Sequence, residues 1–146
     1  LASGILFANI YTSLVDAKSW GASMPKSIEA AREYFKVVNA ARFFRTFAPI
    51  NMVVGLLALI LFWNDPVNIR AYLGIALIFY AMGDVLTFAY FYPRNRIMFL
   101  TTPIPDTETL RKAWKGWTTM NWVRSLIFFV GIGFSFLALY TIYISK

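Results

Sequence analysis

The chain has 146 residues, of which 59% are hydrophobic, 18% aromatic and only 14% charged, with 14 Lys and Arg against 7 Asp and Glu. Soluble domains carry about 25% charged residues, so this composition excludes an ordinary soluble domain. It predicts a single all-α integral membrane domain over residues 1–146. The chain contains no Cys and no His, which excludes disulfides, thiolate or imidazole catalysis and metal sites built on those ligands.

Long uncharged stretches predict four membrane-spanning helices in a bundle. The first stretch is uncharged before Asp16 and is shorter than the roughly 20 residues of a full span, so we interpret it as the later part of a helix that begins before Leu1. The third stretch carries a single charge, Asp84, and the other two carry none between their flanking charges. The predicted spans are 1–17, 46–64, 71–93 and 121–145.

Two long connections, 22–45 and 94–120, separate these spans. In the first, Ile28, Ala31 and Phe35 recur at helical spacing, which predicts an amphipathic helix. In the second, the acidic residues from Asp106 onward predict the start of another amphipathic helix.

The cations predict the orientation of the chain in the cell membrane. All Lys and Arg residues except Arg70 and Lys146 lie in the two long connections or at their flanks. The positive-inside rule therefore places both connections in the cytoplasm and both termini outside. The excess of positive charge then meets anionic lipid headgroups, and no nucleic-acid partner is expected.

Charge inside the hydrocarbon region is the most informative feature of the sequence, because it costs several kcal/mol unless it is paired or hydrated. Asp84 lies well inside the third predicted span and shares one helical face with Tyr80 and Thr87. Arg124 lies near the start of the fourth span and could reach Asp84. Two interpretations remain open: a functional site, or a structural ion pair that fastens two helices.

Further polar side chains occur at comparable depth. Asn9, Asn51 and Asn121 could hydrogen-bond between helices, or could line one cavity with Asp84 and Arg124, walled by aromatic residues. Two glycines of the fourth span, Gly131 and Gly133, predict close packing of helices.

Two short elements resemble a known family. Pro93 and Asn95 form a P-x-N element at the end of the third span, and Trp117, Asn121 and Arg124 form a W-x-x-x-N-x-x-R element at the opening of the fourth. Both resemble the anthrone oxygenase-like family of small four-helix membrane proteins, and residues 4–9 and 34–49 are similar too. The resemblance implies oxidation of polycyclic anthrones to anthraquinones by O2, without metal, flavin or other cofactor.

Such chemistry needs a base, donors for an enolate-like oxygen and a dry aromatic pocket. We expect Asp84, chosen from the residues alone, to be the base or to orient it, and Asn121 and Arg124 to be the oxyanion donors. Trp117 would form a pocket wall. The expected substrate-binding residues are Trp117, Asn95, Tyr80 and Asn9.

Other interpretations compete with this one. A tight Asp84–Arg124 pair would make the carboxylate a poorer base, Asn95 could cap the third span, and Trp117 and Arg124 could be interfacial anchors. The chain could then be a non-catalytic subunit with membrane protein partners, or a protein that binds lipid or a quinone-like aromatic ligand. A cavity would favour the enzyme or the ligand-binding protein.

Overall fold

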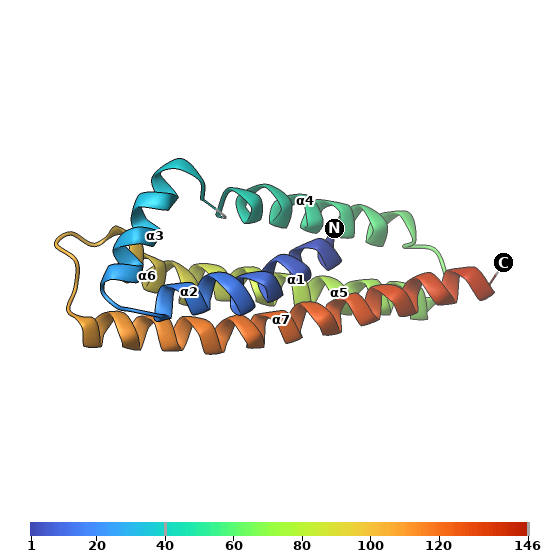
Figure 1. Ribbon diagram of the computed structural model, residues 1–146. Helices are drawn as coiled ribbons and strands as arrows, with labels where there is room; N and C mark the ends of the chain where they lie inside the picture. The colour runs from blue at the N-terminus through green and yellow to red at the C-terminus, as the bar shows by residue number, and fades with distance from the viewer. Residues whose placement is uncertain (40, 146) are drawn as a thin grey trace.

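The computed structural model describes residues 1–39 and 41–145, which form helices joined by short loops and no strand (Figure 1). The all-α prediction is confirmed. The first continuous helix comprises α1 (Ala2–Tyr11), the π-helical turn η1 (Thr12–Asp16) and α2 (Ala17–Gly21). Next come α3 (Lys26–Val37) and α4 (Ala41–Leu61). A long helix comprises α5 (Val67–Leu86), η2 (Thr87–Phe91), α6 (Tyr92–Asn95) and η3 (Arg96–Leu100). The last helix is α7 (Thr107–Ile144).

Within the described residues, three helices are long and apolar enough to cross a membrane: Ala41–Leu61, Val67–Leu100 and Thr107–Ile144. They identify the chain as a membrane protein. The helix over residues 2–21 lies beside them in the structure but is not one of the three.

The second long connection differs from the prediction, because its helix is not separate from the last span. α7 is one helix of 38 residues, about 57 Å long at 1.5 Å per residue. Asp106 caps it as expected, accepting a hydrogen bond from the backbone N–H of Thr109 at 3.0 Å, and the Thr109 hydrogen bonds lower the pKa of that carboxyl. No proline follows Asp106, so nothing in the sequence ends the helix before the apolar stretch begins.

The third predicted span also continues beyond its expected end at residue 93. Pro93 lies in the first turn of α6, directly after the π-helical turn η2. Proline is tolerated there because the irregular turn accommodates its missing N–H and its ring. The helix therefore runs on to Leu100, and Asn95 lies inside it rather than capping its end.

The amphipathic helix predicted in the first connection is confirmed as α3, which runs across the direction of the long helices (Figure 1). Ile28 and Ala31 are buried. The Arg32 guanidinium donates from Nε to the Met98 carbonyl and from Nη1 to the Thr101 carbonyl, each at 2.8 Å. These hydrogen bonds attach α3 to the end of η3, where the last carbonyls have no partner within the helix.

Close packing joins α5 and α7, which lie side by side along the bundle (Figure 1). Phe128 stacks on Tyr80 with ring centroids 5.7 Å apart, and a Cβ added at Gly131 would lie 2.8 Å from Cε1 of Tyr80. A Cβ added at Gly133 would meet nothing within 4 Å. Of the two glycines predicted to pack closely, only Gly131 does so.

Gly131→Ala should destabilise the protein by about 1–3 kcal/mol, because the added methyl group overpacks a rigid aromatic contact. Gly133→Ala is the matched control in the same helix, and it should leave stability unchanged or slightly raised. Thermal unfolding of both variants in detergent would measure the difference. Equal effects at the two positions would contradict the packing described.

Candidate functional site

A cavity of about 720 Å³ lies between α4 and the other helices. This volume falls within the range of about 300–1,000 Å³ that small-molecule sites occupy. Nine of its 23 lining residues are aromatic, and every described helix contributes to the walls. The aromatic lining residues are Trp20, Phe35, Phe44, Phe88, Phe91, Tyr92, Phe99, Trp117 and Phe128.

Arg124 of α7 forms the polar floor of this cavity and is only 6% exposed. Its Nη2 donates to Oδ1 of Asn121 at 2.6 Å and to Oδ1 of Asn9 at 2.8 Å. Its Nη1 donates to Oγ1 of Thr87 at 3.2 Å, and its guanidinium carbon lies 4.1 Å from the centroid of the Phe91 ring. Neutral oxygens and a ring face, rather than a carboxylate, therefore solvate the buried cation.

Asn121 lies behind the cavity wall and is not among the lining residues. Its Nδ2 donates to the carbonyl of Asn9 at 2.9 Å and to Oγ of Ser13 at 2.6 Å. Both amide hydrogens are thus used within the protein, while its oxygen holds Arg124. This geometry suits a residue that positions Arg124 and the first helix, rather than one that contacts a ligand.

Three buried donors have no hydrogen-bond partner among the described residues: Nδ2 of Asn9, Nε1 of Trp117 and Nε of Arg124. All three belong to residues that line the cavity. A buried donor without an acceptor costs about 1–3 kcal/mol. Donors of this kind in one cavity favour a ligand that brings an oxygen acceptor, either a carbonyl or an oxyanion.

Asp84 lines the same cavity and is half-buried. The Asp84–Arg124 ion pair, one of the two interpretations left open by the sequence, is not formed: the one ion pair within residues 1–39 and 41–145 joins Lys36 to Glu33 at 2.7 Å. No hydrogen bond to the Asp84 carboxylate occurs within those residues either. The carboxylate is therefore open to a ligand.

The other predicted binding residues divide between the cavity and the helix interface. Asn95 lines the cavity. Tyr80 does not, because its hydroxyl lies 2.9 Å from Oγ of Ser135, where it joins α5 to α7. Sequence reasoning missed Arg45 and Arg96, which also line the cavity; they had been assigned to membrane topology alone.

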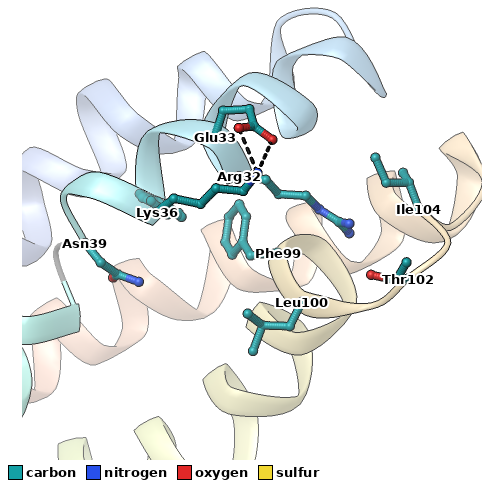
Figure 2. Close-up of a pocket in the computed structure, with 9 residues that line it drawn as sticks. Arg32, Glu33, Lys36, Asn39, Phe99, Leu100, Thr102 and Ile104 are labelled. Carbon is teal, nitrogen blue, oxygen red and sulfur yellow. Dashed lines mark hydrogen bonds and ion pairs between the residues drawn. The ribbon is translucent and has the colours of Figure 1, made fainter.

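A second, smaller cavity of about 450 Å³ lies between α3 and the segment after η3 (Figure 2). Phe35, Asn39, Phe99 and Leu100 line both cavities, so these side chains form a shared wall. The rings of Phe35 and Phe99 meet edge to face, with centroids 5.0 Å apart.

Fold and cavity together define a helical membrane protein with an aromatic-lined cavity and a buried cation at its base. Residues 35–134 match the family model described as anthrone oxygenase. This match covers more than half of the chain, and the chain belongs to the anthrone oxygenase family. The matched range contains Asp84, Trp117 and Arg124 but not Asn9, so the likeness expected at residues 4–9 lies outside it. No curated protein and no solved structure matches the chain.

Asn121→Ala should destabilise the protein by about 2–3 kcal/mol, because it leaves the Asn9 carbonyl and one Arg124 hydrogen without their partner. Asn68→Ala, at an exposed position of α5, is the control and should change stability by less than about 0.5 kcal/mol. Chemical or thermal unfolding in detergent measures both. A loss at Asn121 no larger than that at Asn68 would refute a positioning role.

Proposed function

We propose that this chain is a membrane oxygenase that oxidises a lipophilic polycyclic aromatic substrate of the anthrone type with molecular oxygen and without a bound cofactor. One observation carries the proposal: an open carboxylate, Asp84, shares an aromatic cavity with three unpartnered donors. Family membership supports the choice of substrate class.

The reaction begins with proton removal. The Asp84 carboxylate takes a proton from the methylene carbon opposite the substrate carbonyl, and the electron pair spreads through the rings onto the carbonyl oxygen. Nε of Arg124, Nδ2 of Asn9 and Nε1 of Trp117 donate to that oxygen and stabilise the anion. The free donors thus meet negative charge where it develops.

Oxygen then reacts at the deprotonated carbon. The carbanion transfers electrons to O2, a carbon–oxygen bond forms, and protonated Asp84 returns its proton to give a hydroperoxide. Asp84 removes the second proton from the same carbon while the O–O bond breaks, and the departing hydroxide takes that proton to become water. The balance is one CH2 group and one O2 converted to one C=O group and one H2O.

The aromatic walls suit this chemistry in two ways. Flat rings such as those of Phe91 and Trp117 can pack against a planar tricyclic substrate. Excluding water also strengthens the hydrogen bonds to the anion, and apolar walls admit apolar O2.

A second candidate is a quinone-binding protein without turnover, because the same three donors suit a quinone oxygen. The accessory-subunit interpretation is less favoured, since it expects paired side chains and no cavity. Oxygen consumption separates the first two candidates.

We also propose that the chain crosses the cell membrane four times, with residues 2–21 as the first span beside the three long apolar helices. Both long connections then face the cytoplasm and both termini face outside, as the distribution of cations favours.

Asp84→Asn should lower the anthrone-dependent rate of oxygen consumption by about 100-fold or more, since general-base catalysis contributes roughly 10²–10⁴-fold. The assay follows oxygen uptake and anthraquinone absorbance in nanodiscs, with uncatalysed autoxidation subtracted. Asp65→Asn, at an exposed turn position, is the control. Trp117→Phe keeps a ring but removes one donor, and it should lower kcat about 10-fold, while Trp122→Phe on the exposed face of α7 should not.

A wild-type rate equal to autoxidation, or an unchanged rate in Asp84→Asn, would refute the catalytic proposal. Binding of anthraquinone without oxygen uptake would favour the quinone-binding protein.

Introduced cysteines test the topology, because the chain has none of its own. An impermeant thiol reagent added to intact cells should label Asn68→Cys and should not label Lys112→Cys. Permeabilised cells provide the control, in which both should react. The opposite pattern in intact cells would overturn the orientation.

A further inference from the structure

Two arginines line the outer part of the cavity without a protein partner. Arg45 of α4 and Arg96 of η3 are both exposed, and both belong to the cavity lining. Neither side chain makes a hydrogen bond or ion pair with the described residues. The single acidic residue of the lining is Asp84, so the charges of the cavity sum to a clear positive excess.

Two other arginines near this end of the cavity have partners within the protein. Arg32 donates to backbone carbonyls at the end of η3. Arg94 lies over the ring of Tyr90, 3.4 Å from its centroid, and donates to the Tyr90 carbonyl at 3.1 Å. Arg45 and Arg96 therefore differ from these two arginines in having both a free guanidinium and a place in the cavity lining.

Exposed aromatic side chains mark where the cavity opens. Phe88 is 64% exposed and Tyr92 is 43% exposed, yet both line the cavity, and their ring centroids lie 5.1 Å apart. Arg96 follows Tyr92 by about one helical turn. The mouth therefore combines an apolar edge, suited to entry from the hydrocarbon of the membrane, with cations toward its polar end.

We propose that Arg45 and Arg96 form an anion subsite at the mouth, which binds the carboxylate or acidic phenol of the same aromatic ligand whose rings fill the cavity. This inference rests on the proposed function for the aromatic nature of the ligand. A guanidinium is suited to the task because its planar donors match the oxygens of a carboxylate. The ligand is then an aromatic acid with a second oxygen at its far end, where Arg124 lies.

The test compares two probes that differ in one group: anthraquinone-2-carboxylate and 2-(hydroxymethyl)anthraquinone. Binding to the full chain in phosphatidylcholine nanodiscs is followed by quenching of tryptophan fluorescence, because Trp20 and Trp117 line the cavity. The acid should bind about 10-fold more tightly, which corresponds to about 1.4 kcal/mol. Arg45→Gln with Arg96→Gln should reduce this ratio to about one while leaving the affinity for the alcohol unchanged.

Arg42→Gln is the matched control, because Arg42 is an exposed cation at the same end of α4 but outside the cavity lining. It should retain the acid preference. Comparing ratios between variants cancels the different partitioning of the two probes into lipid.

A wild type without acid preference, or a double variant that keeps it, would overturn the proposal. Anionic lipid phosphate shares the chemistry of a carboxylate, so a lipid arm is included. If the pair serves lipid headgroups, the double variant retains less phosphatidylglycerol on purification and the wild type shows no acid preference, which also overturns the proposal. The assay needs no turnover: acid preference without oxygen uptake would refute the oxygenase and keep the subsite.

Discussion

The burial of one guanidinium organises both the bundle and its cavity. Arg124 is charged at any ordinary pH, and a buried cation without compensation costs several kcal/mol. Compensation comes from three separate helical stretches: Asn9 lies on α1, Thr87 on η2, and Asn121 on α7 itself. Because these groups must converge on one guanidinium, the hydrogen bonds that hold the helices in place also fix the floor of the cavity. Assembly and site geometry therefore depend on the same contacts.

The opposite wall of the cavity is far less constrained. α4 buries a single side chain among the described residues, Asn51, and Figure 1 shows it lying apart from the other long helices over its first half. Pro49 removes one of its backbone hydrogen bonds at the cavity. A polar floor held by several hydrogen bonds thus faces a wall that little buried surface holds in place, so we expect α4 to be the least stable part of the cavity wall.

The sequence predicted what depends on composition and local pattern: the all-α membrane fold, the α3 helix and the Asp106 cap. The placement of Asp84 and Arg124 at one cavity also followed from the sequence, because a charged side chain inside the membrane is costly and therefore faces the bundle interior or a cavity. Whether the two side chains pair could not be decided from the sequence. Periodicity gives the face of a helix on which a residue lies, but it does not show which neutral oxygens compete for a cation. The contribution of Arg96 was hidden for a similar reason: a basic residue near the end of a span fits the positive-inside rule equally well. Asn121 could be placed near the site but not assigned as an internal partner, because that depends on Ser13, about a hundred residues away in the chain.

The π-helical turns make chain length itself a component of the site. Such a turn contains about one residue more than an α-helical turn, and η2 lies between Asp84 and two residues that line the outer part of the cavity, Asn95 and Arg96. Removing one residue from η2 would close the wide turn to regular α-helical geometry and leave the helix beyond it in nearly the same register, because a π-helical turn that loses its extra residue still makes one turn. Removing one residue from the regular α-helix before η2 would instead turn everything beyond it by about 100° about the helix axis and carry Asn95 and Arg96 away from the cavity, although neither had been replaced. The spacing along this helix therefore encodes the geometry of the cavity as directly as the identity of its side chains does.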